Sequence, residues 1–231
     1  FFFKQKTAYE IYQCDWSSDV CSSDLLAPAI PDRAVAAANG ANTTAVLSGI
    51  DPATRQRYVY LETLGGGFGG RATKDGKDGV QVHITNTSNL PVEAIEMEYP
   101  LRVESYGLIE DSGGAGTWRG GLGLRRVVKP VGHEAVFSGT GERFRFAPWG
   151  LFGGKDGKPG RFQRREPDGT LTLLDNKPAE VTLTPDQAVV METPGAGGYG
   201  DPAKRRADAI ERDATSGKFS SGYLRTAYPK G

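Results

Sequence analysis

The sequence has little of what disulfide frameworks, metal sites and membrane spans require. Its 231 residues include two cysteines and two histidines, and the formal net charge is zero. Such a balanced charge does not suggest a surface for nucleic acid or anionic membranes, and no apolar run approaches the roughly 20 residues that cross a bilayer. The isolated His83 and His133 do not form a histidine-rich metal site. We therefore expect no nucleic-acid partner, no membrane span and no metal bound by this chain.

Both cysteines lie in an opening segment, KQKTAYEIYQCDWSSDVCSSDL, that differs from the rest of the chain. Its apolar start is too short for a secretory signal, while a disulfide between Cys14 and Cys21 stays conceivable. Reverse translation of Lys4–Glu10 and Trp16–Asp24 matches constant parts of an adaptor used in sequencing libraries. We interpret residues 1–24 as translated adaptor that forms no domain, packs poorly and carries no function.

Residues 25–231 lack cysteine, which is compatible with a reducing cytoplasm. Short alternating runs, separated by Gly, Pro and Asp roughly every ten residues, predict many short strands. His83 should lie on the polar face of one of them and His133 in a turn. The predicted strands are Arg57–Thr63 (RYVYLET), Gly79–Thr85 (GVQVHIT), GLRRVVK, EAVFSG, RFRF, RFQRRE, TLTLL, AEVTLT and QAVVMET.

The C-terminal end has helical signals instead. Asp201 can cap a helix that begins at Pro202 and stops at Gly217, with an apolar stripe of alanines and Ile210. Ser220 or Ser221 can cap a second short helix. The predicted fold class is therefore α+β and β-rich, with short, mostly antiparallel strands in a sandwich- or barrel-like arrangement closed by two short C-terminal helices.

Two segments are ambiguous at this level. Asn89–Pro100 (NLPVEAIEMEYP) alternates like a strand, yet Pro91 could open a helix. Leu64–Gly70 (LGGGFGG) resembles a linker that would divide an N-terminal remnant from the main body.

Four motifs have a chemical interpretation beside a structural one. Glu110–Gly116 (EDSGGAG) places a serine beside backbone donors as in a serine protease, but a glycine-rich turn is favoured because no triad partner has a supporting context. LGGGFGG and PGAGGYGDP could bind phosphate through N–H groups; neither continues into a Walker loop, and an anion contact stays open only for the second. GERFRFAPWGLFGG suits a half-buried strand with an aromatic face, with substrate-facing arginines as the alternative.

Several long blocks, in this order, resemble the hydantoinase B/oxoprolinase family. They are NLPVEAIEMEYPLRVESYGLIEDSGGAGTWRGGLGLRR, PWGLFGGKDGKPG, PGAGGYGDP and the closing AIERDATSGKFSSGYLRTAY. The resemblance covers most of residues 31–228, with Ala196 at a place where the family usually has Gly. Family members are about twice as long or longer, which implies that residues 25–231 are the C-terminal part of such a domain and are inactive alone.

The resemblance implies a B component of an ATP-dependent cyclic-amide hydrolase acting on hydantoins or 5-oxoproline. ATP would be bound and used by a hydantoinase A-type subunit or domain, would phosphorylate the amide oxygen, and would leave the B component to complete hydrolysis. A divalent metal would belong to the absent N-terminal part, so this chain would bind no cofactor itself. The resemblance therefore also implies a hetero-oligomer with the A-type subunit in the cytoplasm. The alternatives are a subunit of a related acetone or acetophenone carboxylase, and a structural module that holds the A-type partner.

Site residues are taken from positions that match the family's motifs. The catalytic candidates are Glu93, Glu96, Asp111 and Arg119. The substrate-binding candidates are Ser112, Gly113, Gly114, Arg143 and Trp149. The alternative for the acidic tract that contains Glu93 and Glu96 is a solvated face without a chemical role. Further matching positions without an assigned role are Gly120, Gly121, Gly150, Gly153 and Gly154.

Glu110–Gly121 is rich in glycine, since five of its twelve residues are glycine. Glycine loses much conformational freedom on folding, so such density suggests a backbone that must approach a ligand or another chain closely. We expect this block to face a functional cleft or a partner interface, with a solvent-exposed turn as the alternative.

Overall fold

The computed structural model describes residues 27–82 and 88–229. Two antiparallel sheets pack face to face as a sandwich, one with strand order β2-β1-β5-β8 and one with order β3-β4-β9-β6-β7. The strands are β1 Thr43–Ile50, β2 Arg57–Leu64, β3 Leu101–Leu108, β4 Leu124–Pro130, β5 Ala135–Thr140, β6 Arg161–Arg165, β7 Leu171–Leu173, β8 Val181–Leu183 and β9 Ala188–Glu192. The helices are α2 Val92–Glu98, the 3₁₀ turn η2 Pro202–Lys204, α3 Ala207–Thr215 and α4 Ser221–Ala227.

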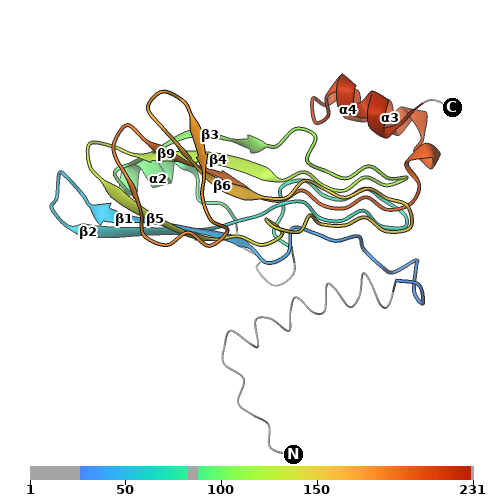
Figure 1. Cartoon of the computed structure of the whole chain (residues 1–231), viewed down its shortest axis with the longest axis horizontal. Coiled ribbons are helices and arrows are strands. Elements are labelled where there is room, and N and C mark those ends of the chain that lie inside the picture. The colour runs from blue at the N-terminus through green and yellow to red at the C-terminus, as the bar shows by residue number, and fades with distance from the viewer. Residues whose placement is uncertain (1–26, 83–87, 230–231) are drawn as a thin grey trace, which may run out of the picture.

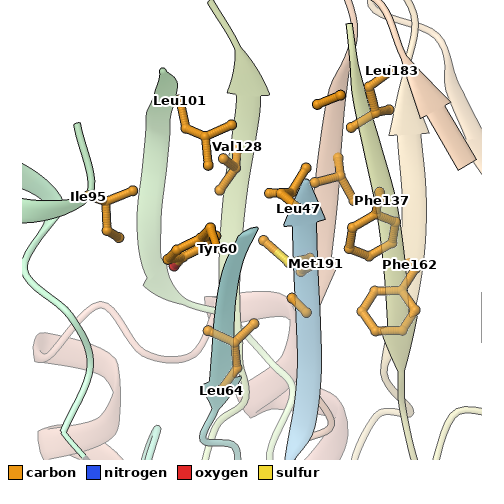
Figure 2. Close-up of a cluster of buried hydrophobic side chains, with 13 residues drawn as sticks. Leu47, Tyr60, Leu64, Ile95, Leu101, Val128, Phe137, Phe162, Leu183 and Met191 are labelled. Atoms are coloured by element: carbon orange, nitrogen blue, oxygen red, sulfur yellow. The ribbon is translucent and has the colours of Figure 1, made fainter. Parts of the chain in front are cut away.

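Alternation of side chains explains why these runs form a two-layer structure. Along β1 every second residue from Thr43 to Leu47 is buried, and the residues between them face outward. The buried faces of both sheets meet in one hydrophobic core, in which Leu47 and Phe137 from one sheet pack with Val128, Phe162 and Met191 from the other (Figure 2). The predicted β-rich α+β class and the two C-terminal helices are therefore confirmed, and the described strands form a sandwich rather than a closed barrel.

Helix α2 closes one end of this core. Pro91 precedes its first turn, and its only fully buried side chain, Ile95, joins the core cluster. The ambiguous NLPVEAIEMEYP segment is thus a helix that runs into β3, because a single apolar side chain per turn is enough to anchor a seven-residue helix on the sandwich.

A second region, here called the glycine bundle, continues beyond the sandwich toward α3 and α4 (Figure 1). Its extended segments bond to one another by backbone groups without forming regular strands. Ala36 N donates to Gly70 O, Gly70 N to Gly197 O, and Gly197 N to Ala37 O, each at 2.9 Å. Three segments distant in sequence therefore close a triangle of hydrogen bonds. The bundle comprises residues 34–40, 65–80, 112–123, 148–160 and 193–200.

Glycine is required in this bundle for its missing Cβ. A Cβ built on Gly69 would lie 1.8 Å from Ala36 O, and one on Gly121 would lie 1.8 Å from Lys77 O. Neither glycine has a φ in the left-handed region. The linker interpretation of LGGGFGG is wrong. Gly67 N and Gly70 N both donate hydrogen bonds to the segment 194–197, so LGGGFGG is an integral part of the bundle.

Two predicted strands and one predicted helix differ from the structure in detail. The run RFRF forms a bend, because Arg143 has φ +55° and leaves the pleat. In GVQVHIT the described part, Gly79–Val82, has only an isolated bridge between Val80 and Gly66, and His83 lies outside the described residues. His133 does lie in the bend between β4 and β5, where its Nε2 is 2.7 Å from the Tyr58 hydroxyl.

The predicted single helix from Pro202 to Gly217 is in fact η2 followed by α3. Arg205 and Arg206 are extended between them, with ψ of 131° and 141°. The predicted stripe is also wrong, because Ala209 and Asp213 are the buried residues of α3. The predicted caps and the stop at Gly217 are confirmed. Asp201 accepts a hydrogen bond from Ala203 N, Ser220 accepts one from Tyr223 N, and Gly217 has φ +66°.

Candidate functional site

The motif Glu110–Gly121 lies inside the glycine bundle and meets the chain's own backbone. Gly114 N donates to Ala196 O at 2.8 Å, and Gly121 N donates to Phe68 O at 2.9 Å. A Cβ on Gly114 would lie 2.0 Å from Lys155 O. The close approach that the glycines imply is therefore present, but its partner is the neighbouring segments of the same chain.

Asp111 and Ser112 stabilise the turn that enters this motif. Asp111 has φ +60°, and its two carboxylate oxygens accept from the Ser220 amide and hydroxyl, each at 2.7 Å. Asp111 therefore holds the N-cap residue of α4. The Ser112 hydroxyl donates to Ile109 O at 2.7 Å and accepts from Gly123 N at 3.0 Å. These backbone partners agree with the glycine-rich turn rather than with an activated nucleophile.

Arg119 is the centre of a buried ion-pair network between the bundle and the C-terminal helices. Its Nε donates to Asp213 Oδ1 at 3.0 Å and its Nη1 to Asp78 Oδ1 at 2.8 Å. Arg205 bonds Asp75 with both Nη atoms, at 2.8 and 2.9 Å, and reaches Asp213 Oδ2 at 2.6 Å. Asp213 on α3 thus bridges the two arginines.

The charges of this network balance. Three cations, Arg119, Arg205 and Lys218, face three carboxylates on Asp75, Asp78 and Asp213. Burial alone would raise the pKa of Asp78, but hydrogen bonds from Arg119 and Lys218 hold that pKa below its ordinary value. The network therefore attaches α3 and α4 to the bundle. Because its charges cancel, it leaves no net charge with which to bind a charged ligand.

Glu93 and Glu96 lie on α2, at the opposite end of the molecule from α3 and α4 (Figure 1). Glu93 is exposed in the first turn. Glu96 Oε1 accepts from Val103 N at 2.9 Å and lies 3.4 Å from Arg102 Nε. The four residues named as catalytic candidates are therefore split between two ends of the fold and do not form one constellation.

A different cluster forms where the bundle meets the first strand. The Arg143 guanidinium lies 4.1 Å above the Trp149 ring, so two substrate-binding candidates come together. Glu142 Oε2 accepts from Ala41 N at 2.8 Å. A Cβ on Gly40 would be 3.0 Å from Glu142 Oε2 and 3.2 Å from Arg143 Cγ, which leaves room here only for glycine. We call Glu142, Arg143 and Trp149 the junction cluster; Asn39 precedes Gly40 in the chain.

The junction cluster contains groups suited to chemistry that the sequence did not reveal. Burial raises the pKa of Glu142 to about 7, where a carboxyl can both give and take a proton. Asn39 is fully buried, and neither its amide oxygen nor its amide nitrogen has a partner; the same holds for Trp149 Nε1. Buried polar atoms without partners are uncommon and mark a site that needs explanation. No local pattern announces Glu142, because its carboxylate meets Ala41 N, 101 residues away, or Asn39, whose neighbour Gly66 lies 27 residues away.

In residues 27–82 and 88–229, no group of three or more His, Cys, Asp or Glu side chains is arranged to hold a metal ion. Within that part of the chain no helix has the length and apolar character needed to cross a bilayer.

Similar proteins share both sequence and fold with this chain. The protein-family model described as hydantoinase B/oxoprolinase matches residues 8–202. An uncharacterized protein of Methanocaldococcus jannaschii is 41% identical over 198 residues, which are 86% of this chain and 33% of that protein. The 5-oxoprolinase 1 of Arabidopsis thaliana is 39% identical over 146 residues, or 62% of this chain and 11% of that protein.

Two solved structures have the same fold. The crystal structure of the ATP-dependent caprolactamase from Pseudomonas jessenii superposes with a TM-score of 0.76 and 27% identity, covering 88% of this chain and 36% of that one. Nucleotide-free acetone carboxylase superposes with a TM-score of 0.67 and 17% identity over 83% of this chain and 30% of that one, a likeness that shows the fold alone. The chain thus spans about a third or less of the proteins it matches.

Proposed function

Because this chain belongs to the hydantoinase B/oxoprolinase family, we propose that it forms part of the B component of an ATP-dependent cyclic-amide hydrolase. The observation that carries the proposal is the family match together with the names of its relatives. Hydantoins, 5-oxoproline and caprolactam, to which those names refer, all contain an amide within a ring. The substrate class is therefore a cyclic amide, and the native reaction is hydrolysis of its C–N bond in the cytoplasm.

The chemistry explains why a second component and ATP are needed. Resonance gives the amide C–N bond partial double-bond character, so water attacks its carbon slowly. Transfer of the terminal phosphoryl group of ATP to the amide oxygen makes the ring carbon electrophilic. Water then adds to that carbon and the C–N bond breaks with a proton delivered to nitrogen, which leaves an acyl phosphate. A second water hydrolyses the acyl phosphate to the carboxylate and inorganic phosphate. We assign ATP to a hydantoinase A-type partner and the later steps to the B component.

The junction cluster is the part of this chain that we assign to the substrate side. Glu142 can exchange a proton near neutral pH, and the Arg143–Trp149 pair offers a cation and an indole edge beside it. Asp111 and Arg119 act instead as positioning residues, since their polar atoms hold α4 and α3. Glu93, on the opposite end, is available to a partner surface.

The test uses a full-length B component in which this chain replaces the matched region of the M. jannaschii relative, combined with an A-type subunit. We expect ATP-dependent release of the ring-opened amino acid from a hydantoin, 5-oxoproline or caprolactam, and no release by the 231-residue chain alone. The Glu142→Gln variant should lower turnover while the complex still assembles, and the exposed Glu211→Gln on α3 should not.

Two outcomes would overturn the assignment. Carboxylation of acetone or acetophenone without ring opening would make this chain part of a carboxylase, the candidate favoured by the fold it shares with acetone carboxylase. Unchanged turnover in the Glu142→Gln variant, with loss of assembly in the Glu93→Ala variant, would leave the chain a structural module for its partner.

A further inference from the structure

The outward face of the β2-β1-β5-β8 sheet has almost no charge. Cross-strand register places Val46 opposite Leu61 and Ser48 opposite both Val59 and Val136, so these side chains share the face turned away from the core. Twelve residues make up this face, and only the arginine at the hairpin end is charged. They are Thr44, Val46, Ser48, Ile50, Arg57, Val59, Leu61, Thr63, Val136, Ser138, Thr140 and Thr182.

The outward face of the other sheet is of the opposite kind. It has ion pairs between neighbouring strands: Arg161 Nε lies 2.6 Å from Glu192 Oε2, Lys129 Nζ lies 3.4 Å from Glu104 Oε1, and Arg165 also pairs with Glu104. An antiparallel sheet normally covers one face with core and keeps the other polar for water. The outward face of the five-stranded sheet combines these charged pairs with a small buried apolar cluster of Val127, Ala188 and Val190 and with the exposed Leu171 and Leu173. On the four-stranded sheet Arg57 is the one charged residue among the twelve.

The uncharged face is open to solvent in the described chain. Leu61 is 62% exposed, Ile50 59% and Val59 52%. Helix α2 packs against the core side, and α3 and α4 lie beyond the far end of the glycine bundle (Figure 1). Adjacent exposed aliphatic side chains on a regular surface mark a site that another surface covers.

We propose that this face is covered by the part of the family polypeptide that lies outside the region matched here. The four strands have 8, 8, 6 and 3 residues. At about 3.4 Å per residue and about 4.8 Å between strands they give a face of about 400 Å², or about 800 Å² on both sides. That area lies within the range of about 600–1,500 Å² for contacts between domains of one chain. It is below the range of about 1,200–2,000 Å² for stable complexes of separate proteins.

The relatives supply the required length of chain. This chain corresponds to 33% of the M. jannaschii protein and 36% of the caprolactamase chain. About two-thirds of each polypeptide is therefore available to cover the face. The inference rests on family membership and not on the reaction proposed above, so loss of activity alone does not bear on it.

Cysteine accessibility tests the proposal. Leu61→Cys places a thiol on the uncharged face, and Leu173→Cys, on β7 and 68% exposed, places a matched thiol on the outward face of the other sheet. Cys14 and Cys21 are replaced by serine in both variants. In the 231-residue chain both thiols should react with maleimide at similar rates. In the full-length chimera with the M. jannaschii relative, labelling at position 61 should slow by about tenfold or more while position 173 stays reactive.

Each other result contradicts the proposal. Equal labelling of both positions in the chimera would mean that the face stays open. Protection at position 61 that appears only after an A-type subunit is added would make a separate protein the occupant. Protection in the 231-residue chain that rises with its concentration would make a second copy the occupant. Circular dichroism of both variants checks that they fold.

Discussion

The sandwich and the glycine bundle are held together by different forces. In the sandwich, side chains such as Phe137 and Phe162 bury apolar surface between two sheets, and their rings meet at 5.4 Å. In the bundle, backbone bonds to backbone, and the contact distance is set by the absence of Cβ atoms on residues such as Gly69 and Gly121. A sandwich tolerates a smaller side chain with a cavity, whereas at bundle positions such as Gly69 and Gly121 one added carbon would overlap backbone atoms.

The two regions also differ in how they end. Helix α2 closes the sandwich through the apolar Ile95. Helices α3 and α4 close the bundle through the buried Arg119 network and an apolar cluster that includes Phe219 and Leu224. The bundle has few side chains of its own for a helix to pack on, so charged groups at its margin supply much of the attachment.

The largest expected effect is a Gly121→Ala substitution in the bundle. The new Cβ would lie 1.8 Å from Lys77 O and 2.9 Å from Phe68 N, both backbone atoms that cannot rotate away. We expect a loss of more than about 5 kcal/mol, which is enough to unfold a typical domain. Urea denaturation, or failure to obtain soluble protein, measures it.

Gly107→Ala on β3 is the matched control. A Cβ at this position meets nothing within 4 Å, and its φ is outside the left-handed region. Its stability should stay within about 1 kcal/mol of the parent chain. Equal stability of the two variants would show that the bundle is not packed by backbone contact.

The counterpart in the sandwich is Phe162→Ala. The ring is fully buried, 5.4 Å from Phe137 and 4.9 Å from Phe144, so its removal leaves a cavity that neighbours fill only in part. We expect a loss of about 4 kcal/mol in urea denaturation. Phe146→Ala, at a ring that is 69% exposed, should cost less than about 1 kcal/mol. Similar losses at the two rings would refute the core shown in Figure 2.

Removal of the Arg119 guanidinium tests how the bundle is closed. Arg119→Ala leaves Asp78 and Asp213 buried with fewer partners, although Lys218 and Arg205 still reach them. We expect a loss of about 3 kcal/mol. Amide exchange should speed up in α3 and α4 and stay slow in β4 and β9, because only the attachment of the helices is lost.

Arg212→Ala serves as the control for that charge. Arg212 is 70% exposed and pairs with Asp208 on the same helix. Its removal should cost less than about 1 kcal/mol and leave amide exchange in α4 unchanged. Uniform acceleration of exchange across the sheets in the Arg119→Ala variant would instead mean that the bundle and sandwich unfold as one unit.

The smallest effect concerns Glu142, where the two regions meet. Its native pKa of about 7 exceeds the ordinary value of 4.5, so between these pH values the folded chain holds a proton that the unfolded chain has lost. Stability is therefore complete below pH 4.5 and falls as pH rises through 7. The shift corresponds to about 3 kcal/mol, of which we expect about 2 kcal/mol because local relaxation relieves part of the burial.

Glu142→Gln should remove this dependence. A neutral amide keeps an acceptor for the Ala41 amide and cannot ionise, so the variant should be more stable than the parent at pH 8 and similar at pH 4.5. Thermal melts across that range measure the difference. A parent chain whose stability does not fall between pH 6 and 8 would contradict the raised pKa.

The strands and caps could be predicted from sequence because their causes are local. The period of two marks β2 and β5 as strands, and Ser220 caps α4 with a hydroxyl three residues from its donor. Which face of β2 is buried was not local, since Val59 and Leu61 on its outward face are apolar and Glu62 on its inward face is not. Strand β1 was missed because its face alternates alanine, leucine and threonine with valine and serine, a weaker contrast. The family resemblance rested on similarly contiguous blocks of sequence.

Tertiary structure alone decided what those blocks do. Five glycines in Glu110–Gly121 suggested close approach, but only the fold shows that the partner is the chain's own segments at 68, 77 and 196. Asp213 is buried where Arg119, 94 residues away, meets it, and no local pattern announces that burial. Burial in the fold raises the pKa of Glu142 and outweighs the hydrogen bond that Ala41 N, 101 residues away, donates to its carboxylate. Turn and strand preferences act within a few residues, whereas the burial of a charge or a glycine depends on which distant segment the fold brings to it.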